Sequence, residues 1–123
     1  MSDPDNTGPA PRNTPSVFGA NTAPEDIERM AKHAQQASDF LKAMSHEGRM
    51  MIICHLATGE KSVTELEALL SARQAAVSQQ LSRLRLEGMI KPRREGKAIF
   101  YSLADDRPKK VMDVVFELFA AED

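Results

Sequence analysis

Outside the middle of the chain, apolar residues recur every three or four positions, which is the spacing of one face of an α-helix. This spacing predicts a first helix from about Thr22 to Met44 and a second from Gly48 to Ala57, with residues 45–47 as its cap. Thr22 and Glu25 have the spacing of a capping box, so the first helix is expected to begin there. A last helix is expected over Pro108–Ala121, where the apolar positions are Val111, Val114, Val115, Leu118 and Phe119.

Residues 62–102 carry a more specific pattern. Residues 62–70 and 74–87 predict two helices joined by a turn at 71–73, and Gly88 is expected to end the second. Residues 89–102 contain two strand-like runs around Glu95-Gly96, where glycine accepts the positive φ of a type I′ or bulged hairpin turn. Pro92 favours a sheet edge for the first run, because proline cannot donate to a ladder. Two helices over a turn, followed by a hairpin, predict a winged helix-turn-helix.

The domain organisation follows from composition. Residues 1–21 hold four prolines among small polar residues, which predicts a disordered tail. Residues 22–123 are expected to form one domain for DNA binding and dimerisation, because one domain fits a chain of 123 residues. Its predicted fold is mainly α with a small β-hairpin: about five helices plus a two-stranded wing.

The two terminal helices have broad apolar faces with little sequence left to cover them. Such faces are often buried against a second copy in a twofold-symmetric homodimer. The residues expected at this interface are Leu41, Val111, Val115, Leu118 and Phe119. The alternative is that both helices close over the core of a monomer.

The charge is distributed unevenly along the chain. The net charge is −2, yet residues 72–97 contain seven Lys and Arg against two Glu, so this stretch carries +5 and the remainder −7. A concentrated basic stripe in an otherwise acidic chain indicates a polyanionic partner, in this context double-stranded DNA. A solvated helix face would explain the arginines of the second helix but explains the basic hairpin less well.

On the second helix of the motif, Val77, Leu81 and Leu84 are expected to pack inward. The opposite face carries short polar groups that allow close approach to a major groove: Ala75, Ser78, Gln79, Ser82 and Arg83. Gln79 suits adenine and Ala75 suits a thymine methyl, while the two serines can contact base or phosphate. Phosphate is expected at Arg73 and Gln74 on the helix N-terminus, and phosphate or minor-groove contact at Arg93, Arg94 and Lys97 of the wing.

Several classes of protein are disfavoured by the residues present. A single cysteine, Cys54, excludes an intramolecular disulfide in this chain and a thiolate-rich zinc site. The sequence has no apolar run of bilayer length and no signal-peptide pattern, so we expect a cytoplasmic protein without a membrane partner. It also lacks a nucleophile–base set, a phosphate loop and paired inward carboxylates, so neither an enzyme nor a cofactor is expected.

With these residues in hand, the chain resembles the ArsR family of small winged-helix repressors over about residues 39–119. The resemblance rests on the order and spacing of residues 41–49, residues 76–85 and residues 93–103. It implies a dimer formed by the terminal helices, which releases DNA when an inducer binds. Metal sensing is not expected, because the positions of the family's metal ligands hold no cysteine at residues 63–69 and no histidine at residues 111–122.

Residues 51–56 resemble the second helix of the sulfide- and persulfide-responsive, dithiol branch of that family, the SqrR/BigR/HlyU-like repressors. In that branch a cysteine here reacts with a second one near the end of the last helix, and the bridge loosens DNA binding. Ala120 stands at the partner position, so this chain is either a natural single-thiol relative or a substituted form. Two states of Cys54 stay open: a small buried hydrophobe with a raised pKa, or a reactive thiol.

The sequence therefore predicts a homodimeric repressor whose binding to a palindromic operator is set by a sulfur or redox signal at Cys54, the inducer being a reactive sulfur species. Two alternatives remain: a DNA-binding repressor that responds to a ligand other than a thiol reagent, and a winged-helix module that binds an acidic protein. Serine and glutamine on the outward helix face favour DNA, because a protein interface would need an aromatic or arginine anchor.

Overall fold

The structure is a computed structural model that describes residues 16–122. Most of the predicted tail, residues 1–15, lies outside the described residues, while residues 16–22 form a hydrogen-bonded turn. The Thr22 hydroxyl accepts a hydrogen bond from the Gly19 N–H at 2.6 Å and donates to the Gly19 carbonyl at 2.8 Å. The predicted Thr22–Glu25 capping box is therefore wrong, because the hydroxyl serves the preceding turn and the helix begins at Pro24.

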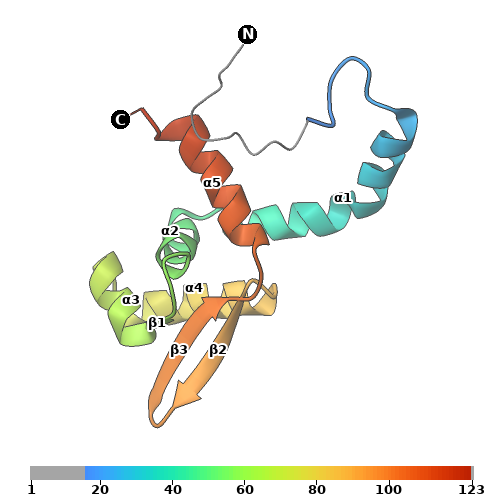
Figure 1. The fold of residues 1–123 in the computed structure, drawn as a ribbon. Coiled ribbons are helices and arrows are strands. Elements are labelled where there is room, and N and C mark those ends of the chain that lie inside the picture. Colours follow the sequence, from blue (N-terminus) through green and yellow to red (C-terminus); the bar gives the residue numbers. More distant parts are fainter. Residues whose placement is uncertain (1–15, 123) are drawn as a thin grey trace. The chain divides into compact units, whose positions relative to one another are not determined.

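The described chain forms two compact units, residues up to Gln35 and residues from Gln36 onward, and helix α1 contributes to both. The elements, in chain order, are α1 (Pro24–Met44), α2 (Glu47–Leu56), β1 (Lys61–Ser62), α3 (Val63–Leu70), α4 (Gln74–Leu86), β2 (Ile90–Glu95), β3 (Ala98–Leu103) and α5 (Arg107–Phe119) (Figure 1). The predicted helices are thus all present, with ends that differ by one or two residues.

Side-chain caps fix the beginnings of α2 and α3. His46 precedes α2, and its Nδ1 accepts a hydrogen bond from the Gly48 N–H at 3.0 Å. Ser62 precedes α3 in a complete capping box: its hydroxyl accepts from the Glu65 N–H at 3.0 Å, and the Glu65 carboxylate accepts from the Ser62 N–H at 2.7 Å. Each cap satisfies backbone groups that a helix start leaves without partners, so the sequence determines where these helices begin.

Gly88 ends α4, as the sequence predicts. Its φ is +75°, and the N–H groups of Gly88 and Met89 donate to the carbonyls of Arg85 and Leu84 at 2.9 and 3.0 Å. This is a Schellman motif, which favours glycine because a Cβ is unfavourable at that φ. The motif directs the chain from the end of α4 into the first strand of the hairpin.

The sheet has three strands in the order β1-β3-β2, so the predicted two-stranded wing gains a short third strand. The register pairs Lys61 with Tyr101 in β1–β3 and Pro92 with Tyr101 in β2–β3. Pro92 therefore lies on an edge strand, as predicted. Figure 1 shows the β2–β3 hairpin extending away from the helices.

The hairpin turn differs from the prediction in position and type. Glu95 pairs with Ala98, so the two turn residues are Gly96 and Lys97. Gly96 has a φ of +61° while Lys97 is not in the left-handed region, which fits a two-residue type II′ turn and not the expected type I′ or bulged turn. The turn thus presents the Lys97 side chain at the tip of the wing.

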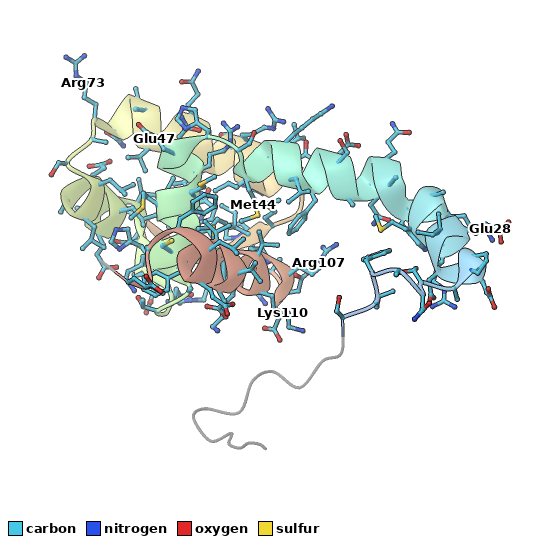
Figure 2. The ribbon with its side chains drawn as sticks, turned by 90° about the horizontal axis from the view of Figure 1, so that it is seen from above. Glu28, Met44, Glu47, Arg73, Arg107 and Lys110 are labelled. Atoms are coloured by element: carbon cyan, nitrogen blue, oxygen red, sulfur yellow. The ribbon has the colours of Figure 1, made fainter. Side chains whose placement is uncertain are left out.

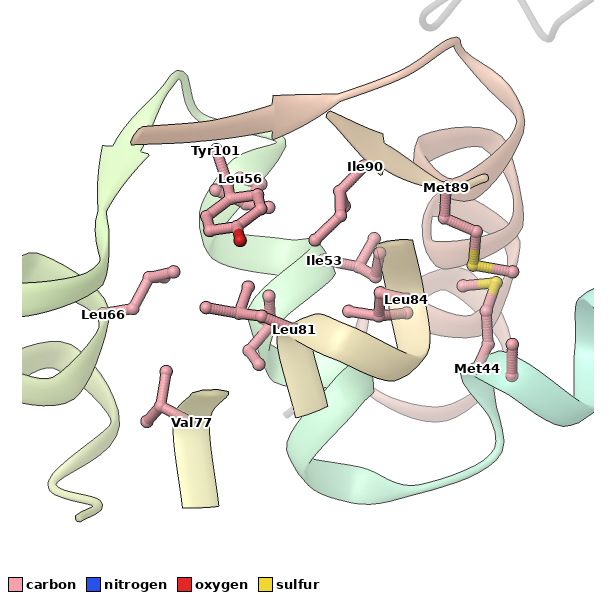
Figure 3. Close-up of a cluster of buried hydrophobic side chains, with 12 residues drawn as sticks. Met44, Ile53, Leu56, Leu66, Val77, Leu81, Leu84, Met89, Ile90 and Tyr101 are labelled. Atoms are coloured by element: carbon pink, nitrogen blue, oxygen red, sulfur yellow. The ribbon is translucent and has the colours of Figure 1, made fainter. Parts of the chain in front are cut away.

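The core lies where α2, α3, α4 and the sheet meet, and its side chains are drawn in Figure 3. Ile52, Ile53, Leu66 and Leu84 are completely buried. Met44 at the end of α1 and Met89 after α4 point toward one another at one edge of this cluster (Figure 3). Truncating a residue such as Leu84 to Ala would cost about 2–5 kcal/mol, so this cluster holds the recognition elements in place.

Candidate nucleic-acid interface and thiol cavity

Helix α4 has one buried and one exposed face, as the sequence predicts. Its inward residues are at most 2% exposed: Val77, Leu81 and Leu84. Its outward residues, which the sequence assigns to DNA, are all exposed: Gln74, Ala75, Ser78, Gln79, Ser82 and Arg83. The packing of the inward face against α2 and α3 fixes which side chains face solvent.

A groove of about 310 Å³ runs between this outward face and the wing. Gln74, Ser78 and Ser82 line one side of it, and Lys97 and Ala98 of the hairpin line the other. The groove therefore brings the serines of the recognition helix and one of the predicted wing cations to the same surface. Its floor includes Tyr101, which anchors β3 in the core.

Arg73 occupies the N-cap position of α4 and makes no capping hydrogen bond with its side chain. Figure 2 shows this side chain pointing away from the ribbon at the turn between α3 and α4. The Arg73 side chain accepts no hydrogen bond from the first N–H groups of α4. The helix dipole makes this end of α4 favourable for an anion.

The two arginines of the wing lie on opposite faces of the hairpin. The register pairs Arg93 with Phe100 and Arg94 with Ile99. Side chains alternate along a strand, so Arg94 shares the face of Ile99 and Tyr101, which line the groove. Arg93 shares the other face with Phe100, and its guanidinium lies 4.8 Å from the ring centre.

Arg93 is engaged within the chain. It donates two hydrogen bonds of 2.8 Å to the carboxylate of Glu60, in the loop before β1, and one of 3.1 Å to Glu95. The hydrogen bonds that Arg93 donates to Glu60 raise the pKa of Arg93, and the same bonds lower the pKa of the Glu60 carboxyl. Arg93 therefore fastens the wing to the preceding loop, and we name this contact the Glu60–Arg93 latch.

Arg83 is the second cation of the basic stripe with an acidic partner, since its Nε lies 3.7 Å from the Glu87 carboxylate. This pair is partly exposed and its distance is long, so it contributes little to stability. Arg94 and Lys97, in contrast, are exposed and make no ion pair within the part of the chain that the structure describes.

Cys54 lines a cavity of about 620 Å³ between α2, α5 and the start of α4. The thiol is half-buried, and burial raises its pKa. Ala120, the position that the family resemblance assigns to a second thiol, lines the same cavity. The structure therefore brings these two positions to one site, although they are far apart in the sequence.

The five residues predicted for a dimer interface differ in exposure, and one of them, Phe119, is both exposed and part of the lining of the cavity beside Cys54. Leu41, Leu118 and Phe119 are 52%, 69% and 77% exposed. Val111 packs against the core of its own protomer, and Val115 lines the cavity beside Cys54. The apolar stripe of α5 is thus wider than the chain itself covers, and Leu118 and Phe119 remain exposed.

Two contacts were not anticipated from the sequence. One is the Glu60–Arg93 latch. The other is Arg49, which donates to the carbonyls of Ala43 and Lys42 at the end of α1 and, at 2.9 Å, to the side-chain oxygen of Gln80 in α4. Burial and the nearby charge of Arg83 lower the pKa of the Arg49 guanidinium. No local sequence pattern signals these contacts, because Glu60 and Arg93 are 33 residues apart and Arg49 and Gln80 are 31 residues apart.

Neither a metal centre nor a membrane span is found over residues 16–122. No cluster of three or more His, Cys, Asp or Glu side chains in this range is arranged to hold a metal ion. No helix in it has the length and apolar character needed to cross a bilayer.

Comparison with known proteins identifies the family to which this architecture belongs. Residues 46–91 match the family model described as bacterial regulatory protein, arsR family. A biofilm growth-associated repressor from Agrobacterium fabrum is 44% identical over 95 residues, which cover 77% of this chain and 81% of that protein. The transcriptional activator HlyU from Vibrio cholerae is 36% identical over 97 residues, covering 79% and 90% of the two chains.

The crystal structure of the transcriptional repressor BigR from Xylella fastidiosa is 38% identical and superposes with a TM-score of 0.74, covering 77% of this chain and 97% of that one. These matches confirm the winged-helix fold and the family resemblance inferred from the sequence. The chain therefore belongs to the arsR family of bacterial regulatory proteins, and it is a winged-helix regulator and not an enzyme.

Proposed function

We propose that this chain is a homodimeric transcriptional repressor that binds operator DNA in the bacterial cytoplasm, with α4 in the major groove and the hairpin along the backbone. The observation that carries the proposal is the groove between the outward face of α4 and the wing. Its short polar side chains let the backbone of α4 approach base edges closely, and Lys97 adds a cation beside them. The Agrobacterium relative is named a repressor, which supports repression as the direction of regulation.

The contacts divide into base reading and backbone anchoring. Ala75, Ser78, Gln79 and Ser82 read bases, because they are exposed, short or amide-bearing, and share one helix face. Backbone phosphates are held by cations and by the helix start: Arg73, Gln74, Arg83, Arg94 and Lys97. Arg93, also predicted from the sequence to contact DNA, serves the wing indirectly through the Glu60–Arg93 latch.

The dimer interface in this proposal is formed by the exposed apolar residues of α5 and the end of α1: Leu41, Leu118 and Phe119. Two copies related by a twofold axis present two recognition helices, which suits a palindromic operator. Val111 and Val115 support this surface from below, since both are half-buried on the inner side of α5.

We also propose that the regulatory signal acts at the cavity that holds Cys54 and Ala120. Reactive sulfur species would modify the Cys54 thiol, the one cysteine of the chain. With alanine at position 120 the product is a cap such as a persulfide, because a bridge needs a second thiol. A cap leaves α2 and α5 unlinked, so the response of this chain to sulfur is expected to be weak.

Two substitutions test the division of the DNA contacts. Gln79→Ala removes a base-reading amide and should weaken operator binding by about 1–3 kcal/mol, with little change on random DNA. Arg94→Ala removes a phosphate contact and should weaken binding to both DNAs alike.

Anisotropy titrations with operator-containing and scrambled duplexes measure both effects. Lys110→Ala, which removes an exposed cation from α5, is the matched control and should change neither. If Gln79→Ala and Arg94→Ala behaved identically on scrambled DNA, the division would be wrong.

A further inference from the structure

The cavity beside Cys54 is large enough for a ligand. At about 620 Å³ it falls within the range of about 300–1,000 Å³ that small-molecule pockets occupy. Met51 of α2, Ala76 of α4, and Met112, Phe116 and Phe119 of α5 belong to its apolar wall. Methionine side chains adapt to ligands of different shape, so this wall suits an apolar guest.

The lining is almost entirely apolar, so it disfavours a charged guest, which would lose its hydration there. Neither lysine nor arginine lines the cavity, so an anion would lose its hydration without gaining a cationic partner. His46 belongs to the lining, but its Nδ1 already accepts the Gly48 N–H. Glu47 contributes a carboxylate at the exposed start of α2, and the remaining lining is apolar except for Cys54 and Gln80. The chemistry therefore fits a neutral, largely apolar molecule.

Gln80 supplies one polar group for such a molecule. Its Oε1 accepts a hydrogen bond from Arg49 at 2.9 Å, and a guanidinium only donates, so the amide oxygen must be the atom that faces Arg49. The amide nitrogen makes no hydrogen bond within residues 16–122, and Gln80 lines the cavity. A ligand oxygen such as a ketone can accept from that nitrogen.

The same residues connect the cavity to the DNA-reading face. Gln80 lies in α4 directly after Gln79, and Ala76 and Val77 of the first turns of α4 also line the cavity. Arg49 ties Gln80 to the carbonyls at the end of α1. A guest that fills the cavity or bonds to Gln80 therefore acts directly on the helix that carries the base-reading side chains. Packed interfaces of this kind respond by discrete shifts of whole elements.

We propose that the cavity between α2, α5 and the start of α4 binds a neutral, apolar small molecule with one hydrogen-bond acceptor, and that a molecule bound there weakens operator binding. The claim that the cavity binds such a molecule depends on the cavity alone. The claim that binding weakens the contact with operator DNA rests on the proposed function and deepens it, because it names a non-covalent inducer class for the site that holds Cys54.

The probe for the test is Prodan, a neutral naphthalene ketone whose emission shifts to the blue in apolar surroundings. The full chain should bind it saturably, one molecule per protomer. Ala120→Phe places a ring in the cavity and should weaken Prodan binding by roughly tenfold or more. Ala121→Phe adds the same ring at an exposed neighbour that does not line the cavity, and should leave Prodan binding unchanged.

The natural thiol gives a second readout that needs no substitution. Bound Prodan should slow alkylation of Cys54 by N-ethylmaleimide, followed by intact mass, and should leave the protein mass unchanged after dialysis. Absence of saturable binding, equal affinity in Ala120→Phe, or unprotected Cys54 overturns the proposal. Complete protection of Cys54 in the dimer in the absence of Prodan would assign the cavity to a second copy of the chain, and overturns the proposal too.

Coupling to DNA is measured by operator titrations with and without saturating Prodan. Operator affinity should fall by a factor in the range of about 5–150, and by thermodynamic reciprocity operator DNA should weaken Prodan binding by the same factor. Prodan binding without this mutual effect overturns the regulatory half. A chain that binds Prodan and protects Cys54 but never binds upstream DNA specifically would instead refute the proposed function, so the two failures are distinguishable.

Discussion

At the scale of single residues, Cys54 illustrates how position decides reactivity. Its thiol lies among apolar side chains, and burial raises its pKa because the thiolate loses hydration. Since the thiolate is the nucleophile, the thiol should react slowly near neutral pH. The residue that we propose as a sensor thus lies in surroundings that lower the reactivity of a thiol.

This environment predicts the pH dependence of alkylation. A raised pKa lowers the thiolate fraction at neutral pH, so the alkylation rate of Cys54 should continue to rise above the pH at which a free thiol levels off. Rates with N-ethylmaleimide across the alkaline range, compared with the same chain unfolded in urea, measure the difference. A folded-state profile that levels off at lower pH than the unfolded one would mean that a nearby group stabilises the thiolate.

The second residue-scale prediction concerns Ala120, the position that the family resemblance assigns to a second thiol. Persulfide treatment of the natural chain should barely change operator affinity, whereas Ala120→Cys should make it strongly responsive, because both positions line one cavity. Ala121→Cys is the matched control: it adds a thiol one residue away, outside that lining, and should not confer a response. Mass spectrometry identifies the bridge, and a DNA titration measures its effect. A large loss of affinity in the single-cysteine chain would show that a cap is sufficient.

Sequence patterns identify residues on regular helices better than residues in long-range contacts. The inward and outward faces of α4 follow from a period of 3.6 residues, and Val77, Leu81 and Leu84 are buried as predicted. The ion pair between Arg93 and Glu60 could not be predicted, because the two residues are 33 positions apart in the sequence. The sequence alone does not show whether a cationic side chain binds a phosphate or a neighbouring carboxylate.

At the scale of elements, the wing is held by an ion pair that would compete with DNA in the proposed complex. Glu60 takes two hydrogen bonds from Arg93, a cation that would otherwise be available to a phosphate. Glu60→Gln should therefore strengthen non-specific DNA binding and increase the salt dependence of binding by about one counterion per protomer.

Glu117→Gln is the control for that prediction, because it removes the same charge from the exposed side of α5. Titrations on scrambled duplex over a range of salt concentrations give the slope for both variants. Equal slopes would mean that Arg93 does not gain access to DNA when the latch is removed. Thermal unfolding of Glu60→Gln checks that the wing remains folded.

Helices were predictable as elements because caps and periodicity agree along the chain, as Ser62 and Gly88 show. Strand β1 was not, since two residues, Lys61 and Ser62, are too short to display alternation. Their strand character comes from pairing with Tyr101 and Phe100 of β3. The turn type was also missed, because a Glu95-Gly96-Lys97 sequence allows two registers and the pairing of Glu95 with Ala98 selects one.

At the scale of the whole molecule, the charge and the apolar surface indicate different partners. The +5 stretch of residues 72–97 belongs to α4 and the wing, whereas Val114, Leu118 and Phe119 of α5 are apolar and at least half exposed. A second copy that covers α5 would double the basic surface, and a dimer of this kind would contact on the order of six to ten phosphates. Dimerisation and DNA affinity should therefore be lost together.

Leu118→Glu tests this link. Leu118 is 69% exposed in the single protomer, so glutamate is tolerated there by an isolated chain. In a dimer it would bury two unpaired charges, a cost on the order of 3 kcal/mol or more per site. Sedimentation should therefore show a folded monomer, and operator affinity should fall while the circular dichroism spectrum is retained. Leu86→Glu, at an 81% exposed position at the end of α4, is the matched control and should remain dimeric. A folded Leu118→Glu dimer of unchanged mass would place the interface on another surface of the chain.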